Sequence, residues 1–224
     1  MTQLILNTKL FAPAQRPNIV HRPRLIKRLT RGLRGKLTLI SAPAGFGKTT
    51  LASAFLHDVF EQPIAWLSLD DEDNDISKFL LYLTASLETI QKGISQSVFT
   101  PFHQMQVPPP NAIITSLINE IIEMHPEPFA LVLDDYHVIT NNAVHDALSF
   151  LIDHIPHHVH LAILSRKDPP LPLARLRAQN QLLEIRANDL RFSHSEAKIF
   201  FSQTMRLDLK SEEISTLETR TEGW

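Results

Sequence analysis

The sequence predicts an α/β protein in which a five-stranded parallel sheet lies between two layers of helices. Short apolar runs of strand length alternate along the chain with longer stretches whose apolar residues recur at helical spacing. Parallel neighbours need crossover connections of a dozen or more residues, and these helical stretches can supply them. The expected strands are 36–41, 64–69, 129–133, 159–165 and 182–185.

Each expected helix follows from the spacing of its apolar residues. Residues 22–34, "RPRLIKRLTRGLR", form a basic amphipathic helix with its apolar residues on one face. Near the C-terminus, Ser193 and Glu196 make a capping box that opens another helix. The proline-rich segment 93–110 should be a loop. Further helices are expected at 49–60, 76–90, 112–124, 143–155, 172–179 and 211–220.

Composition excludes several classes of protein. The chain has 224 residues, 43% of them apolar, and it contains no cysteine, so disulfides and thiolate metal sites are impossible. No apolar run approaches the roughly 20 residues of a membrane span, and the N-terminus lacks the pattern of a signal peptide. We therefore expect a cytoplasmic protein without a membrane partner.

Positive charge is concentrated in the first quarter of the chain. Residues 1–57 contain ten Lys or Arg and no acid, whereas the remaining residues contain twelve basic residues and 24 acids. The positive electrostatic potential of this part of the chain favours an anionic partner without identifying it. Bound phosphates, nucleic acid and an acidic neighbouring domain all remain open on this ground.

The segment 42–50, "APAGFGKTT", lies between an expected strand and an expected helix and has the pattern of a phosphate-binding loop. Backbone N–H groups at a helix N-terminus bind phosphates tightly where small, φ-permissive residues let the backbone wrap, as at Gly45 and Gly47. Ala42 replaces the first glycine of the usual GxxxxGK[ST] pattern, and alanine is the least costly replacement there. The residues expected around the phosphates are Ala42, Pro43, Ala44, Gly45, Phe46 and Gly47.

Three side chains at the end of this loop complete the expected nucleotide site. Lys48 can reach the β and γ phosphates, Thr49 can place its hydroxyl on Mg²⁺, and Thr50 would lie near the α phosphate. The alternative is a glycine-rich turn between a strand and a helix that binds nothing.

Two acids follow the apolar run "FALVL" and are expected at the tip of that strand. A site for Mg²⁺ and nucleotide requires a carboxylate at the end of a buried strand near the loop, and Asp134 is so placed. Asp135 comes next, and we assign it the role of general base toward water. Ordinary turn and capping chemistry is the alternative for this pair.

The strand "VHLAILS" ends on Ser165 and Arg166. If this strand lies between the strand before the loop and the strand before Asp134, its tip reaches the γ phosphate. Arg166 would then distinguish triphosphate from diphosphate, because a guanidinium makes bidentate contacts to phosphate oxygens and keeps its charge. A solvated loop arginine is the competing interpretation.

These motifs predict the P-loop NTPase fold, a three-layer sandwich whose five-stranded parallel sheet has the order 5-1-4-3-2. We expect residues 1–35 to be an arm and basic helix that flank the nucleotide site. Residues 36–205 would form the ATPase core, and residues 206–224 would begin a helical extension that is truncated.

Five blocks of the sequence resemble successive blocks of the N-terminal ATPase domain of MalT-like regulators, the large ATP-binding LuxR-type activators among the signal-transduction ATPases with numerous domains. The resemblance implies a switch that rests with ADP, self-associates with ATP, and is reset by slow hydrolysis. It also implies a longer protein with sensor and helix-turn-helix domains, of which this chain is a fragment. The blocks are "KLFAPAQRPNIVHRPRL", "LTLISAPAGFGKTTL", "IAWLSLDDEDND", "LVLDDYHVIT" and "LSRKDPPLPLARLRAQNQLLEI".

By the same resemblance, Val20 and Arg22 would lie beside the adenine base. Arg175 and Arg177 would contact a neighbouring protomer, although a plain surface helix is the alternative there. The basic helix 22–34 could bind DNA phosphates, but in this fold we expect it to pack beside the nucleotide, so no direct DNA binding by this fragment is expected. A metabolic P-loop kinase or phosphotransferase, and a nucleotide-binding module without hydrolysis, remain alternative functions.

Overall fold

The computed structural model describes residues 5–14, 19–94, 108–124 and 127–220, and its centre is a five-stranded parallel sheet. The strand order is β2-β3-β4-β1-β5, which confirms the predicted order when it is counted from the other edge. All five predicted strands are present within a residue or two of their expected ends. They are β1 (Leu37–Ser41), β2 (Ile64–Ser68), β3 (Phe129–Asp134), β4 (Val159–Ser165) and β5 (Leu182–Arg186).

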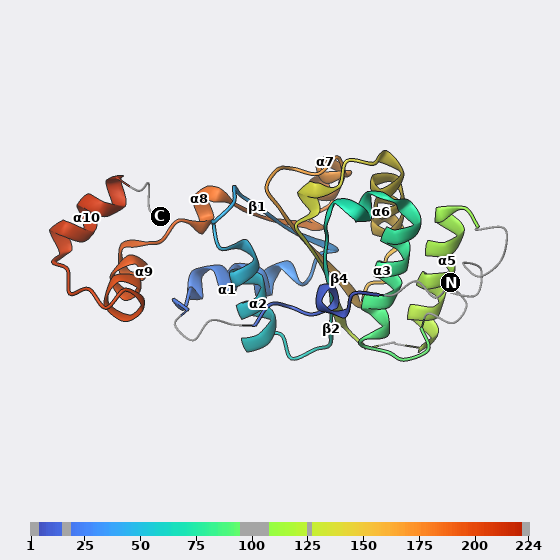
Figure 1. Ribbon diagram of the computed structural model, residues 1–224, viewed down its shortest axis with the longest axis horizontal. Helices are drawn as coiled ribbons and strands as arrows, with labels where there is room; N and C mark the ends of the chain where they lie inside the picture. Colours follow the sequence, from blue (N-terminus) through green and yellow to red (C-terminus); the bar gives the residue numbers. More distant parts are fainter. Residues whose placement is uncertain (1–4, 15–18, 95–107, 125–126, 221–224) are drawn as a thin grey trace.

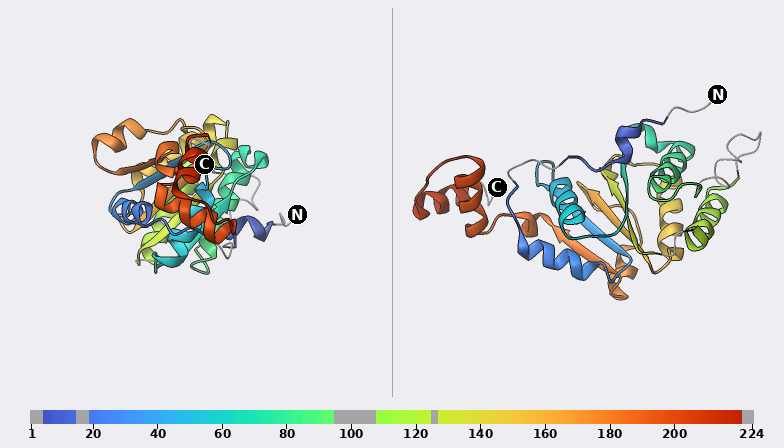
Figure 2. Two further views of the ribbon diagram at one scale, coloured as in Figure 1. Left: turned by 90° about the vertical axis from the view of Figure 1, so that its left-hand side faces the viewer. Right: turned by 90° about the horizontal axis from the view of Figure 1, so that it is seen from below.

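Helices cover both faces of the sheet (Figures 1 and 2), which confirms the three-layer sandwich. Helices α1 (Pro23–Gly32) and α2 (Lys48–Asp58) pack on one face, against alternate strand residues such as Ile40 and Val132. The intervening residues, such as Leu39 and Leu131, point to the other face. The helices there are α3 (Ile76–Glu88), α5 (Pro110–Met124), α6 (Asn142–His154) and α7 (Leu173–Ala178).

Local signals at the helix ends agree with the prediction in most places. The capping box of Ser193 and Glu196 opens α9 (His194–Ile199) as expected. Gly32 is the last residue of α1, and a Cβ there would lie 2.9 Å from the Cβ of Leu183, so close packing on β5 favours glycine. Most of the predicted loop 93–110 lies outside the described residues.

Several one-turn helices were not predicted, because an element of three or four residues shows no periodicity. These short elements are η1 (Asn7–Leu10), η2 (Asp71–Asn74), η3 (Tyr136–Val138) and α8 (Ala187–Leu190). Three of them, η2, η3 and α8, begin within three residues of the end of a strand, at the edge of the sheet where the phosphate-binding loop lies.

The C-terminal helices extend away from the sheet (Figure 1, red). A π-helical turn, Phe200–Thr204, follows α9, and α10 (Ser211–Arg220) packs against α9. Arg22 and Arg24, from the segment before α1 and its first turn, form ion pairs with Glu196 of α9 at 3.4 and 3.6 Å. Throughout the described ranges, no helix combines the length and apolar character that crossing a membrane requires.

Candidate functional site

The loop between β1 and α2 has the backbone that phosphate binding requires. Gly45 and Gly47 adopt left-handed conformations, with φ of 82° and 69°, which side chains other than glycine rarely tolerate. Ala42 is buried and is not among the residues with positive φ. An alanine therefore fits at the entrance of the loop without strain, and the departure from the usual pattern leaves the loop intact.

Lys48 begins α2 and lies against the inside of the loop. Its ammonium donates hydrogen bonds to the carbonyl oxygens of Ala42, at 2.8 Å, and Pro43, at 3.0 Å. Burial lowers the pKa of Lys48, while the negative charge of Asp135 opposes this shift. The ammonium is thus held beside the N-terminus of an eleven-residue helix, whose first N–H groups have no partners within the helix.

Thr49 and Asp134 bring oxygen atoms together as the sequence predicted for a metal site. The Thr49 hydroxyl donates to the two carboxylate oxygens of Asp134, at 3.0 and 3.2 Å. The Asp134 side chain is almost completely buried, and the backbone N–H of Asp135 donates to it at 2.9 Å. A hydroxyl and a carboxylate are ligands that Mg²⁺ accepts, so these two residues fit the ion.

Burial, with the neighbouring charge of Asp135, raises the pKa of Asp134 to about 6. The raised pKa means that the folded state prefers the neutral acid, so wild-type stability falls as pH rises from 3.8, the ordinary value, toward 6. The difference of about 2 pH units corresponds to about 3 kcal/mol. We expect Asp134→Asn to gain stability relative to the wild type by up to this amount between pH 4 and pH 7, measured by urea unfolding. An unchanged difference between the two proteins would contradict the raised pKa.

Asp135 differs from Asp134 in both backbone and exposure. Its φ is 56°, in the left-handed region, and its side chain is 48% exposed. Aspartate is one of the few residues other than glycine that visits this region. The carboxylate is therefore turned toward solvent beside Lys48, where water can reach it.

Arg166 lies directly after β4, which the register places between β1 and β3. The condition on which its predicted role depended is therefore met. The charge of Arg166 helps to lower the pKa of Lys48, after burial, and also that of His137. Arg166 is exposed, and its charge, like that of Asp135, is close enough to Lys48 to influence the pKa of that ammonium.

The two residues that follow Asp135, Tyr136 and His137, had no role predicted from the sequence. The Nδ1 atom of His137 lies 3.7 Å from a carboxylate oxygen of Asp135, and burial lowers the pKa of His137. Tyr136 is buried, and its hydroxyl lies 2.8 Å from Nδ1 of His145 in α6. Their position in the sequence could have indicated that they lie near the site, because both residues directly follow the two acids in "DDYH".

The residues predicted to surround the base and to face a partner make contacts within the chain. Val20 is buried, and the Arg22 guanidinium donates to the carbonyl of Arg191 at 2.7 Å. Arg175 pairs with Asp153, and Arg177 makes two hydrogen bonds to Glu184, at 2.8 and 2.9 Å. The roles of these four residues toward a nucleotide or a protomer stay predictions.

The fold and the loop geometry define the chain as a domain of the P-loop NTPase class. No model of a known protein family matches it. The chain is, however, 36% identical to the HTH-type transcriptional regulator MalT of Serratia proteamaculans over 223 residues. It is 37% identical to MalT of Yersinia enterocolitica over 221 residues.

Both alignments cover 99% of the chain and 24% of the relative, so the chain spans about a quarter of the length of these curated relatives. The predicted resemblance to MalT-like regulators is thereby confirmed. A solved structure of a signal transduction ATPase with numerous domains, from Pyrococcus horikoshii and with a tetratricopeptide repeat sensor, has a TM-score of 0.61. It covers 95% of the chain at 16% identity, which shows a shared fold.

Proposed function

We propose that this chain is the ATP-binding switch domain of a signal-responsive transcriptional activator and that it hydrolyses ATP slowly. The observation that carries the proposal is the meeting of Lys48 and Thr49, at the start of α2, with Asp134 and Asp135, at the end of β3. The similarity to MalT regulators supports the regulatory part of the proposal.

Each residue of the site has a separate task in this proposal. The loop backbone from Ala42 to Gly47 and the Lys48 ammonium bind the phosphates, and Thr50 lies near the α phosphate. Thr49 and Asp134 hold Mg²⁺, which would neutralise charge on the phosphate oxygens.

The hydrolytic step requires a base and a sensor near the terminal phosphate. Asp135 accepts a proton from water, and its exposed carboxylate beside Lys48 supports this role. Arg166 contacts the γ phosphate and so reports its presence, which its location after β4 supports. Val20 and Arg22 lie beside the adenine base.

The nucleotide then determines the state of the regulator. ADP gives the resting form, ATP gives an active form that self-associates, and hydrolysis returns the protein to rest. Inducer and DNA are recognised by sensor and helix-turn-helix domains elsewhere in the full-length protein. This ATPase core, in the cytoplasm, binds neither DNA nor membrane directly.

Identification of the nucleotide that the protein carries tests this proposal. We expect the purified chain, once denatured, to release ADP, and a Lys48→Ala variant prepared in the same way to release none. The purified chain should also bind ATP and release inorganic phosphate slowly. Absence of ATP affinity would contradict the proposal. Binding without phosphate release would favour a non-hydrolysing module, and phosphoryl transfer to an acceptor other than water would favour a kinase.

A further inference from the structure

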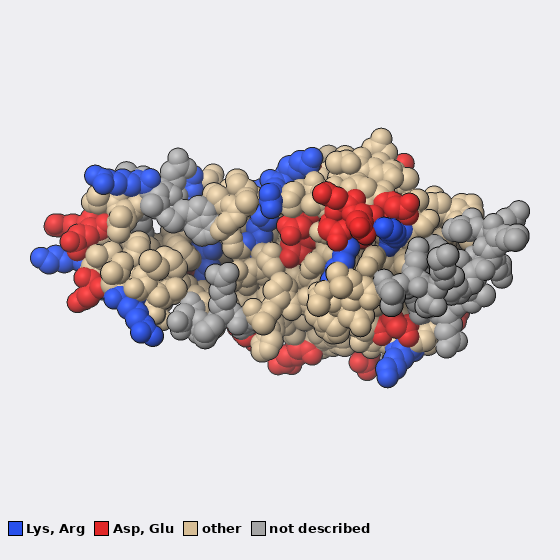
Figure 3. Space-filling model, in the orientation of Figure 1, with Lys and Arg blue, Asp and Glu red and all other residues tan. Residues whose placement is uncertain are grey.

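The turn between β2 and α3 lies directly against the segment that follows Asp135. Strands β2 and β3 are neighbours, and the backbone N–H of Leu69 donates to the carbonyl of Asp134 at 3.0 Å. The turn contains η2, and Figure 3 shows its acidic side chains gathered over the start of α3. Asn74, the last residue of η2, is the one that joins this turn to the segment after Asp135.

A single amide side chain of Asn74 binds three backbone groups of that segment. Its Nδ2 donates to the carbonyl of Val138 at 2.9 Å, and its Oδ1 accepts from the N–H groups of Thr140, at 2.7 Å, and Asn141, at 3.1 Å. Asn141 in turn donates from Nδ2 to the Asn74 carbonyl at 2.7 Å. An amide side chain can make these contacts because it carries an N–H donor and a carbonyl acceptor on one planar group.

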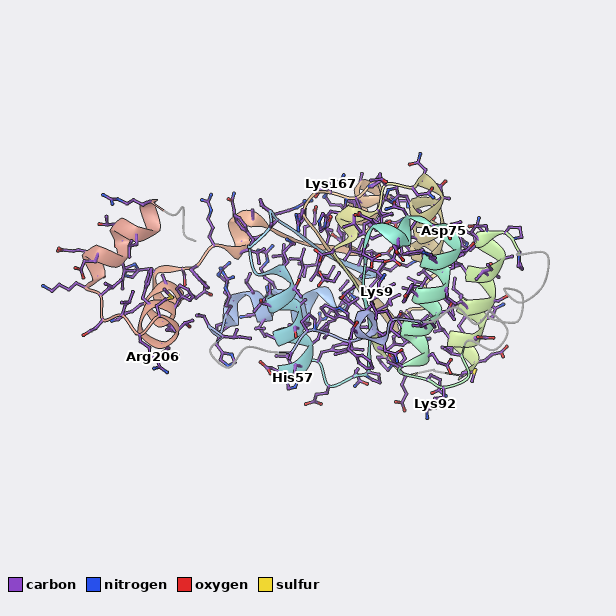
Figure 4. All side chains as sticks on the ribbon, in the orientation of Figure 1. Lys9, His57, Asp75, Lys92, Lys167 and Arg206 are labelled. Carbon is purple, nitrogen blue, oxygen red and sulfur yellow. The ribbon has the colours of Figure 1, made fainter. Side chains whose placement is uncertain are left out.

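The turn is itself held firmly on its other side. Asp70 and Asp73 form a capping box around η2, with the N–H of Asp70 donating to Asp73 at 2.8 Å. The completely buried Asp73 also pairs with Lys9 of the N-terminal segment, at 2.5 Å. Figure 4 shows Lys9 beside α3 and Asp75 at the start of that helix. The turn that carries Asn74 is therefore held in place, and Asn74 contacts residues 138–141 from this fixed position.

The segment that Asn74 holds has a conformation that needs outside support. Asp135 is left-handed, and η3 is a single turn closed by the N–H of Val138 to the carbonyl of Asp135, at 3.1 Å. A left-handed residue other than glycine persists only where its surroundings fix it. The contact of Tyr136 with His145 holds the start of η3, and Asn74 holds the last residue of η3, Val138, and the residues that follow it.

We propose that Asn74 is a positioning residue that holds Asp135 and His137 in place for ATP hydrolysis. This inference rests on the proposed function. Asn74 itself contacts no reacting atom and acts through the backbone of residues 138–141.

The test compares Asn74→Ala with Asp75→Ala in the full chain. Asp75 lies in the same turn, but its carboxylate caps α3 by accepting from the N–H of Lys78 at 2.9 Å. Amide hydrogen exchange without added nucleotide measures directly whether the hydrogen bonds of Asn74 stabilise residues 138–141. We expect Asn74→Ala to speed exchange at Thr140 and Asn141 roughly tenfold and Asp75→Ala to leave it unchanged.

ATP binding and phosphate release then read the functional consequence. Asn74→Ala should keep ATP affinity within about twofold and lower the hydrolysis rate roughly 10- to 100-fold, since small misplacements of a catalytic group have effects of this size. Asn74→Asp keeps the acceptor and loses the donor to Val138, so its hydrolysis rate should lie between the rates of the wild type and of Asn74→Ala. Asp75→Ala should retain the wild-type rate.

The outcomes separate this inference from the proposed function. Unchanged exchange in Asn74→Ala would contradict the claim that Asn74 stabilises residues 138–141. Hydrolysis at the wild-type rate by that variant would contradict the positioning role alone. A wild-type chain that neither binds nor hydrolyses ATP would overturn the proposed function, together with the part of the inference that depends on it.

Discussion

Asp135→Asn is expected to lose ATP hydrolysis by roughly 10²- to 10⁴-fold while ATP affinity changes little. An amide has the shape of the carboxylate but cannot accept a proton from water. Asparagine also tolerates the left-handed backbone at this position, so the turn should survive the substitution. Phosphate release and equilibrium binding of ATP, measured on the same preparation, check the two halves of this expectation.

Two further substitutions serve as controls for the Asp135 result. Asp134→Asn removes the predicted Mg²⁺ ligand, so it should weaken Mg²⁺-dependent ATP binding as well as hydrolysis. Asp208→Asn changes an exposed acid in the segment before α10 and should alter neither. The assignment of Asp135 as the base is wrong if Asp135→Asn hydrolyses ATP at the wild-type rate.

The sheet could be predicted from the sequence because its central strands, β1, β3 and β4, are buried on both faces. Strand β3 reads as an unbroken apolar run that ends on Asp134, and β4 as an apolar run interrupted by His160 that ends on Ser165, so both their length and their functional ends were visible. The strand order required more than this, since it was predicted from the class of fold that the loop and the acids indicated. The observed order confirmed it.

The parts that sequence could not predict depend on contacts between distant residues. The stretch "DDEDND" lies between an expected strand and an expected helix, and Asp70 and Asp75 do cap helices. Nothing in the sequence indicated that Asp73 would be buried against Lys9, 64 residues away, or that Asn74 would bind Thr140. The first pairing depends on the packing of η1 against β2 and α3, and the second on the pairing of β2 with β3, not on local periodicity.

The pair of Lys9 and Asp73 is expected to have the largest effect on stability. The two side chains are 8% and 0% exposed, and their charged atoms lie 2.5 Å apart. Asp70 lies 3.1 Å from the same ammonium, which also lies 4.2 Å from the centre of the Tyr82 ring. Lys9→Met would leave the Asp73 carboxylate buried without its counter-charge, a change that typically costs about 3–5 kcal/mol. Native domains are stable by only about 5–15 kcal/mol, so the loss should be obvious in urea unfolding.

The origin of this loss can be separated from simple loss of packing. Lys9→Met with Asp73→Asn removes both charges, while the amide oxygen can still accept from the N–H of Asp70, so the double variant should recover most of the stability. Burial already raises the pKa of Asp73, and the Lys9 charge opposes that shift. Without Lys9 the pKa rises further, so protonation should shrink the deficit of Lys9→Met as the pH falls from about 7 to about 5. Lys27→Met, on the exposed face of α1, should stay within about 0.5 kcal/mol of the wild type. A deficit below about 1 kcal/mol, or one that grows at low pH, would show that the N-terminal segment is not held by this ion pair.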